Sequence, residues 1–390
     1  MIEIRKLKKD DMEELFDLLN TTFGNKYGRE MHFDLEQPKM WVKDDLHMER
    51  HLAVFEDGKM AAVVGVYPLP LVIGGEDFLF FTTGNVATLP QYEGKGYFSK
   101  LFPLAIEEAR KQGATAARLG GARQRYARFG FEPCGPAYEF TFTMQNIKAL
   151  AAEGDAYTLC PIRREDTEIL AYCHALMEKK RVFVRRSTEE NYRDMFLALG
   201  SKESTPYLLK KNGESVGYVS GSKGLTHIYE CGFEDDRDAL YAVYAAQKMN
   251  PNERITILLP ETMPAAVSAV QSEAQEIALC HPSRFYIMEY KRLVNRLFKV
   301  ADDLCPLPDF DLSIAIEGAD AIALHKGADG CFATAADAKN CDIALSGLEA
   351  ERLLFGIANA DLIAKLPKEK RAALKAVFPL PLTWCTLDYV

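Results

Sequence analysis

The sequence predicts an α+β protein of three domains, and three observations lead to this fold class. Strand-like and helix-like segments alternate over the first 145 residues. The pattern restarts near residue 150. From about residue 290 the sequence pattern changes to short strand-like and helix-like segments. We therefore expect domains at residues 1–145, 146–288 and 289–390, because a chain of 390 residues is too long for one ordinary core.

The first segment predicts the element order β-α-β-β-β-α-β-α-β. A strand at residues 2–4 precedes a helix that Asp10 caps. Two strands flank the Asp-Gly turn at 57–58, and a further pair flanks the Gly-Gly turn at 74–75. A helix over residues 97–112 then ends at a glycine. The segments "ATAARLG", "RQRYARF" and "AYEFTFTM" follow as strand, short helix and strand.

The second segment repeats the first at an offset of 155 residues. "KKDDMEEL" at Lys8–Leu15 is echoed by "RREDTEIL" at Arg163–Leu170, and Gly58 is echoed by Gly213. Two matches at one offset indicate a duplicated domain, with chance similarity of two amphipathic helices as the alternative. The second copy has four carboxylates within Glu234–Asp238, at the start of its helix. These would repel a phosphate, so we expect this copy to be degenerate.

The last segment predicts a smaller α+β domain. "RLVNRLFKVAD" is typical of a helix, and "FDLSIAIEG" and "AIALHKG" are typical of short strands. The stretch "GLEAERLLFGIANADLIAKL" is helical in pattern, and the chain ends in "VFPLPLTWCTLDYV".

Composition and charge exclude several classes of protein. No run of 18 apolar residues occurs, and the charged N-terminus has no apolar core, so we expect neither a membrane span nor a signal peptide. A net charge of −9 argues against nucleic acid as a partner. The nine cysteines are scattered without a Cys-x-x-Cys motif, which favours a cytoplasmic location and predicts no metal site.

The segment "NVATLPQYEGKGYFSKLF" at residues 85–102 carries the first functional signal. It begins as a strand and passes Gly94 and Gly96 at the point where a helix begins. A helix N-terminus exposes unpaired N–H groups and binds anions, and glycines let a pyrophosphate approach the backbone. The alternative is a structural glycine turn without a ligand.

The same segment resembles the coenzyme A signature of the GNAT acetyltransferase superfamily. Gln91, Gly94 and Gly96 fill its Arg/Gln-x-x-Gly-x-Gly/Ala pattern, and "YARFGF" near residue 130 agrees with it. Glu93 departs from the basic residue of many relatives, and Lys95 could offset its charge. The resemblance implies that a strand end, the glycine loop and the exit of the next strand bind acetyl-CoA. These residues are Val86, Ala87, Thr88, Gly94, Lys95, Gly96, Tyr97, Phe98, Ser99, Gly121 and Ala122.

The layout of the whole chain resembles the enhanced intracellular survival (Eis) family of N-acetyltransferases. An intact GNAT domain, a degenerate GNAT domain and a domain like a sterol carrier protein would follow one another. The resemblance implies acetyl transfer from acetyl-CoA to a primary amine, such as an aminoglycoside, a polyamine or a lysine-like amine, by direct transfer in a ternary complex. It also implies a homo-oligomer, a ring-like hexamer.

Acetyl transfer requires a neutral amine and a proton for the departing thiolate. A lysine-like amine has a pKa near 10.4, so a proton acceptor is needed near neutral pH. Tyr126 in "YARFGF" matches the family's proton donor, and core packing is the alternative role for its ring. In the family the C-terminal carboxylate, here that of Val390, accepts the amine's proton; a final strand ending at the surface is the alternative.

Four further residues are expected to bind the amine. Asp388 would attract its charge, and Phe33 and Trp41 in "MHFDLEQPKMW" would supply apolar walls, although core packing explains both equally well. Asn85, at the start of the glycine segment, completes the set.

Two rival functions remain open from the sequence. The chain could be a non-catalytic ligand- or lipid-binding protein that uses its C-terminal domain. It could also transfer a longer acyl chain, as tandem-GNAT myristoyltransferases do. One intact glycine loop together with Tyr126 favours the N-acetyltransferase.

Overall fold

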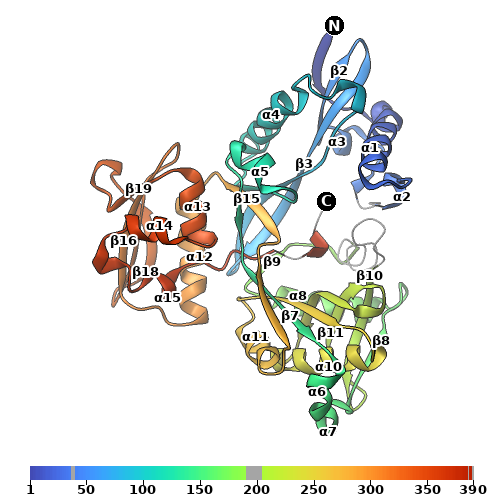
Figure 1. Ribbon diagram of the computed structural model, residues 1–390, viewed down its shortest axis with the longest axis vertical. Coiled ribbons are helices and arrows are strands. Elements are labelled where there is room, and N and C mark those ends of the chain that lie inside the picture. The colour runs from blue at the N-terminus through green and yellow to red at the C-terminus, as the bar shows by residue number, and fades with distance from the viewer. Residues whose placement is uncertain (37–39, 190–203, 385, 389–390) are drawn as a thin grey trace.

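The structure is a computed structural model that describes residues 1–36, 40–189, 204–384 and 386–388. It contains three sheets: two large ones that follow each other along the long axis, and a smaller one to the side (Figure 1). Within these ranges no helix is both long enough and apolar enough to cross a membrane.

The first sheet has eight strands and carries the candidate active site. Helix α4 covers one face and α1 covers the other. The strands, in spatial order, are β1 (Ile2–Lys6), β2 (His51–Glu56), β3 (Lys59–Ile73), β4 (Glu76–Thr88), β5 (Ala116–Leu119), β15 (Ser283–Ile287) and β6 (Glu132–Cys134), with β9 (Val182–Val184) beside β3. The helices of this region are α1 (Met12–Tyr27), α2 (Phe33–Glu36), α3 (Asp45–Met48), α4 (Tyr97–Lys111) and α5 (Arg123–Tyr126).

Alternation along the strands explains why both faces of this sheet are covered. On β3, Val64 and Val66 face α4, where they meet Leu101 and Phe102 in one apolar cluster. The neighbouring Val63 faces α1 and belongs to a second cluster. Successive side chains of a strand point to opposite faces, so one apolar strand contributes to two cores.

The second sheet has seven strands and repeats the element order of the first. Its strands are β14 (Glu276–Cys280), β7 (Ala137–Phe142), β13 (Ile255–Pro260), β12 (His227–Phe233), β11 (Glu214–Ser222), β10 (Ser204–Lys211) and β8 (Tyr157–Pro161). Its helices are α6 (Met144–Ile147), α7 (Ala151–Gly154), α8 (Thr167–Glu178), α10 (Ala239–Met249) and α11 (Pro264–Gln271). The turns at 57–58 and 212–213 both combine a non-glycine residue at φ 51° with a left-handed glycine, which supports the expected duplication.

The two large sheets exchange their last strands. β7 follows β6 along the chain, yet it pairs with β13 and β14 of the second sheet. In return, β15 inserts between β5 and β6 of the first sheet. The boundaries expected at residues 145 and 288 therefore do not separate the sheets, because each of the first two segments contributes a strand to the other.

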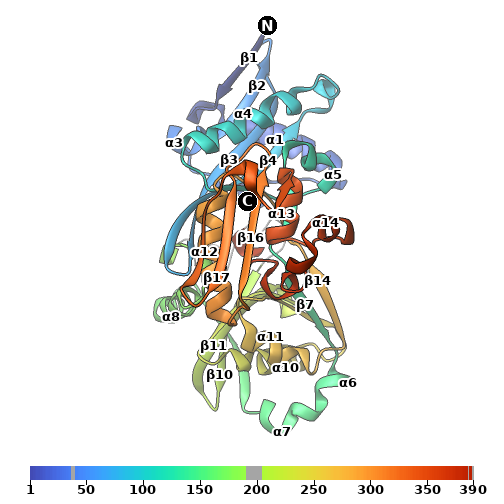
Figure 2. The same ribbon diagram turned by 90° about the vertical axis from the view of Figure 1, so that its left-hand side faces the viewer.

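The third sheet shares an apolar core with the first. It has four strands, in the order β18 (Gly330–Ala335), β17 (Ile322–Gly327), β16 (Phe310–Ile316) and β19 (Ile343–Leu345). Its helices are α12 (Tyr290–Leu304), α13 (Gly347–Phe355), α14 (Ala360–Lys365) and α15 (Leu374–Val377). Leu297 and Phe298 of α12 join Phe78 and Phe80 of β4 in one cluster, so this domain packs against the first sheet. Figure 2 shows the molecule with this domain towards the viewer.

Candidate active site

The central strands β4 and β5 separate at the candidate active site. They pair in parallel from Phe80 to Thr83 on β4 and from Ala116 to Leu119 on β5. β4 then continues to Thr88 without further pairing to β5. The expected cofactor-binding stretch, residues 86–88, lies on this unpaired end. Its backbone edge towards β5 can therefore pair with an extended ligand.

The glycine loop that follows β4 leads into helix α4. Gly94 and Gly96 adopt left-handed φ angles of 78° and 75°, and Gly96 is the N-cap of α4. No side chain caps the helix, and no acidic residue lies in its first turn. A Cβ at either glycine would meet no atom within 4 Å. The N–H groups of Tyr97, Phe98 and Ser99 thus begin an uncapped helix beside open space, which suits an anion such as a pyrophosphate.

Lys95 does not extend over this loop as a free cation. Its ammonium lies 2.8 and 2.9 Å from the two carboxylate oxygens of Glu56 on β2. The hydroxyl of Tyr97 donates to the same carboxylate at 2.5 Å. The hydrogen bond from Lys95, followed by that from Tyr97, lowers the pKa of Glu56. The side chain of Lys95 therefore connects the glycine loop to β2. The side chain of Glu93 is exposed to solvent.

Arg128 supplies the basic group that the sequence analysis missed at this loop. Its guanidinium donates to the hydroxyl of Ser99, in the first turn of α4, at 3.1 Å. It also lies over the rings of Phe129 at 4.7 Å and Phe98 at 5.5 Å, which fix its direction. The signal was present in "YARFGF", where Arg128 stands two residues after Tyr126.

Tyr126 lies at the end of α5 and is brought close to Gly121. A Cβ added to Gly121, which has φ 108°, would approach the Tyr126 ring to 2.9 Å, so only glycine fits there. The ring packs against Phe98 and Phe102, with centroids 6.0 and 5.3 Å away, and 7% of the residue is exposed. Burial raises the pKa of Tyr126, so its hydroxyl keeps its proton at neutral pH. Ala122, the N-cap of α5, is exposed.

Three polar side chains form a buried chain at the bulge of β4. The backbone of Asn85 has φ 51°, where the register between β3 and β4 shifts. The amide of Asn85 donates to the hydroxyl of Tyr67 at 2.7 Å, and that oxygen lies 2.8 Å from Nε2 of His51. Nδ1 of His51 lies 3.2 Å from the carbonyl oxygen of Met48. Burial lowers the pKa of His51 to about 4 and raises that of Tyr67.

Trp41 and Phe33 lie beside this chain, as part of the α1 cluster. The indole of Trp41 stacks on His51 at 5.8 Å and meets Phe16 edge-on at 5.1 Å. Its N–H donates to the carbonyl oxygen of Phe33 at 2.6 Å. Three of the residues expected to bind the amine, Phe33, Trp41 and Asn85, are thus brought together around His51.

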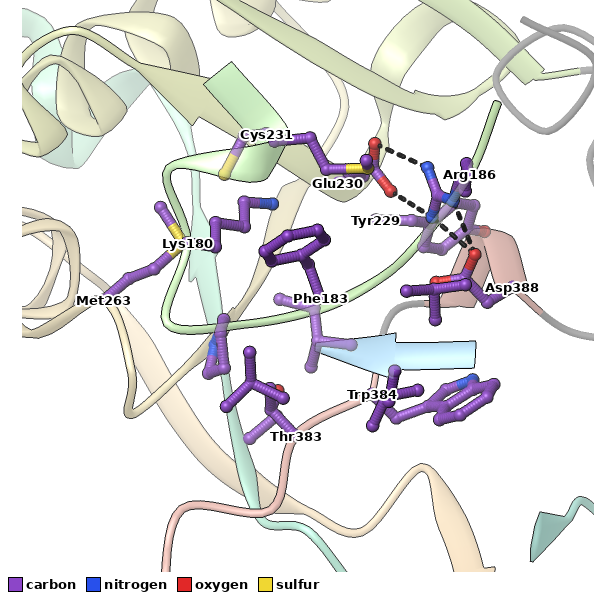
Figure 3. A pocket seen from close by; sticks show the side chains of 17 residues that line it. Lys180, Phe183, Arg186, Tyr229, Glu230, Cys231, Met263, Thr383, Trp384 and Asp388 are labelled. Atoms are coloured by element: carbon purple, nitrogen blue, oxygen red, sulfur yellow. Dashed lines mark hydrogen bonds and ion pairs between the residues drawn. The ribbon is translucent and has the colours of Figure 1, made fainter. Parts of the chain in front are cut away.

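Asp388 occupies a different environment from these three. Its carboxylate accepts hydrogen bonds from Arg186 at 2.6–2.7 Å, and Arg186 also binds Glu230 of β12 at 2.8 Å (Figure 3). The positive charge of Arg186 reduces the ability of Asp388 to attract an amine. Val390, the other expected residue of the tail, lies outside the described residues.

The tail nevertheless reaches the first sheet at Trp384. The buried guanidinium of Arg118 on β5 lies 4.6 Å from the Trp384 ring. Arg118 also donates to the hydroxyls of Thr82 on β4 and Ser283 on β15, both at 3.0 Å. The C-terminal segment therefore contacts β5 through Arg118, which in turn binds β4 through Thr82. No group of three metal-ligating side chains lies together among the described residues.

Comparisons with known proteins agree with this geometry. Residues 3–134 match the family model of the acetyltransferase (GNAT) domain. No curated protein matches the chain significantly in sequence. A GCN5-related N-acetyltransferase from Kribbella flavida has a similar structure, with a TM-score of 0.67 and 17% identity over 100% of this chain and 98% of that one.

Two further structures are similar over nearly the whole chain. A GCN5-related N-acetyltransferase from Anabaena variabilis has a TM-score of 0.68 and 14% identity, with 100% of both chains covered. Eis1 from Mycobacterium abscessus has a TM-score of 0.59 and 13% identity, with 98% of both chains covered. At these identities the structures establish a shared fold. The match over residues 3–134 identifies a GNAT acetyltransferase domain, and by this domain the chain is an acyltransferase.

Proposed function

We propose that the chain is an acetyl-CoA-dependent N-acetyltransferase that acts on a primary amine of the aminoglycoside, polyamine or lysine-like class. The observation that carries the proposal is the uncapped N-terminus of α4, which follows two left-handed glycines and the unpaired end of β4. A strand edge followed by an anion site suits a ligand that has an extended amide arm and a pyrophosphate.

Some of the site residues bind acetyl-CoA, and Tyr126 transfers a proton. Val86, Ala87 and Thr88 offer their backbone to the pantetheine arm. The N–H groups from Gly94 to Ser99 hold the pyrophosphate, and Arg128 neutralises part of its charge. Acetyl-CoA, when bound, supplies the activated thioester. Tyr126, which retains its proton at neutral pH, is the general acid beside Gly121 and Ala122.

The acceptor amine binds beside the α1 cluster in this proposal. Phe33 and Trp41 form its apolar wall, and Asn85 lies at the inner end. The carboxylate of Val390 is the general base. The contact between Trp384 and Arg118 supports this role, because it holds the tail against β5 six residues before the terminus.

The finer family assignment rests on the layout of the chain. The proposal places the protein in the Eis family, with a degenerate second GNAT domain and a third domain like that of sterol carrier proteins. It includes a cytoplasmic location and a homohexamer.

A thiol-release assay with acetyl-CoA against a panel of amines tests the activity. We expect turnover with at least one aminoglycoside, polyamine or lysine-like amine, and none without an amine. The variant Gly96→Glu should lose acetyl-CoA binding, because a side chain and a negative charge both enter the phosphate site. The proposal fails if calorimetry shows no acetyl-CoA binding to the wild type, or if Gly96→Glu binds it equally well.

A further inference from the structure

The second sheet contains a cleft in the same topological place as the candidate active site. Its parallel strands β12 and β13 pair only at His227–Thr256 and Ile228–Ile257, and then separate. A pocket that opens to solvent lies between the separated ends, and its cavity volume is about 50 Å³ (Figure 3). Residues of β12, β13, β9, the tail and the start of α11 line it, among them Tyr229, Cys231, Leu258, Phe183, Trp384 and Met263.

The start of the following helix excludes coenzyme A from this cleft. Where the first sheet has its glycine loop, the second has Asp235, whose carboxylate accepts from the N–H of Arg237 at 3.0 Å. Asp235 also pairs with the guanidinium of Arg237 at 2.6 Å. The carboxylate of Asp238 accepts from the hydroxyl of Tyr157 at 2.7 Å. Acidic side chains thus surround the end of the cleft where a pyrophosphate would bind, so its ligand must carry its charge elsewhere.

Among the charged side chains that line the pocket, Lys180 is the one that can form an ion pair with a ligand. Arg186, Glu230 and Asp388 satisfy one another in a buried network. By contrast, the Lys180 ammonium forms no ion pair in the described part of the chain, and its charge acts on the carboxyl of Asp236, at the start of the following helix, only over a longer distance. Figure 3 shows Lys180 reaching into the same space as Phe183, Cys231 and Met263. An ammonium beside apolar side chains favours a ligand with one anionic end and an apolar body.

We propose that this pocket binds a small monocarboxylate with an aliphatic or aromatic body. The carboxylate pairs with Lys180. The apolar body lies against Phe183, Met263 and Trp384, between the separated ends of β12 and β13. Phosphate-bearing ligands are rejected by the acidic start of the following helix. This site is separate from the acetyl-CoA site and does not depend on the proposed acetyltransferase activity.

A series of ligands with one body and three head groups tests the proposal. Calorimetry on the full chain compares octanoate, octanol and octylamine. We expect octanoate to bind at least tenfold more tightly than octanol, and octylamine to bind more weakly than both. Absence of octanoate binding, or tighter binding of octylamine than of octanoate, overturns the proposal.

Two lysine variants locate the site. Lys180→Met keeps the length and apolar stem of the side chain but removes its charge, so octanoate should bind about tenfold or more weakly while octanol binding is unchanged. Lys179→Met is the matched control, because the neighbouring Lys179 is 60% exposed and pairs with Glu234 outside the pocket lining. Thermal unfolding checks that both variants fold. Unchanged octanoate affinity in folded Lys180→Met overturns the proposal.

Discussion

The hydroxyl of Tyr67 joins His51 of β2 to Asn85 at the bulge of β4. Because the amide of Asn85 donates to this oxygen, the hydrogen of Tyr67 is free to be donated to Nε2 of His51. His51 then carries its own hydrogen on Nδ1, directed at the carbonyl oxygen of Met48. This set of hydrogen bonds is satisfied by a neutral imidazole, in agreement with the lowered pKa of His51.

Protonation of His51 should destabilise the fold in mild acid. Its pKa is lowered from 6.5 to about 4, so the unfolded chain binds the proton more readily between these values. The stabilising contribution is present above pH 6.5 and is lost as the pH falls towards 4. A shift of this size corresponds to about 3 kcal/mol of unfolding free energy.

Urea unfolding at pH 7 and pH 4 measures this loss. His51→Gln should lower the stability at pH 7 and reduce the difference between the two pH values by about 3 kcal/mol. The exposed residue His227 provides the control His227→Gln, which should leave the wild-type difference in place. An equal pH dependence in all three proteins would show that His51 does not titrate in this window.

Gly96→Ala should weaken acetyl-CoA binding more than its effect on stability explains. Gly113, which follows the C-terminal end of α4, is a matched control, since both glycines are left-handed and have open space where a Cβ would lie. Each alanine should cost about 1–2 kcal/mol of stability. In calorimetry only Gly96→Ala should bind acetyl-CoA about tenfold or more weakly, because its Cβ enters the phosphate site. Equal losses of affinity would assign the effect to backbone strain.

Tyr126→Phe should slow turnover without changing acetyl-CoA affinity. Loss of a general acid costs about 10²–10⁴-fold in rate. Tyr138→Phe removes a tyrosine hydroxyl on β7 of the second sheet and should keep wild-type turnover. Steady-state kinetics together with calorimetry separate the two effects. Wild-type turnover in Tyr126→Phe would leave the ring with a packing role among Phe98 and Phe102.

Arg128→Gln should weaken acetyl-CoA binding by about tenfold at low ionic strength and by less at high salt, because exposed charges are screened. The control Arg110→Gln removes another exposed arginine at the other end of α4, where it binds the hydroxyl of Tyr286. Calorimetry at two salt concentrations provides the measurement. A salt dependence identical to that of the wild type would exclude a phosphate contact for Arg128.

The position of the terminal carboxylate should matter more than the side chain of Val390. Val390→Ala should retain most activity, whereas deleting Val390 moves the carboxylate by about 3.3 Å. A misplacement of about 1 Å can cost on the order of 10²-fold in rate. Amidation or one added residue should be comparably harmful. If the amidated protein turns over at the wild-type rate, the terminal carboxylate is not the general base, and the base must lie in the first domain.

Local features of the fold could be predicted from the sequence. The hairpin turns at 57–58 and 74–75 and the start of α4 after Gly96 are confirmed, because dipeptide chemistry and apolar alternation determine them. The cap expected at Asp10 is wrong by one residue. The carboxylate of Asp11 instead accepts from the N–H of Lys8 at 2.7 Å, within a short 3-10 turn before α1.

Features that depend on distant partners could not be predicted. β7 and β15 have the same strand-like alternation whichever sheet receives them, so their exchange leaves no local signal. The pairing of Lys95 with Glu56 spans 39 residues, and that of Asp388 with Arg186 spans 202. Each partner choice is decided by the assembled fold, which is why charges that looked available to a ligand are already engaged.

The exchange of β7 and β15 gives a reason why a second copy that has lost its cofactor site, as we propose for this chain, would survive. After a duplication, a copy that no longer binds a cofactor can be lost from the gene at little cost. Here the loss would also remove β15, which pairs with β5 beside the proposed cofactor-binding strand β4, and would leave β7 without its neighbours. Selection on the intact site therefore extends to residues far from it, and a gene that encodes only the first half should yield an insoluble polypeptide.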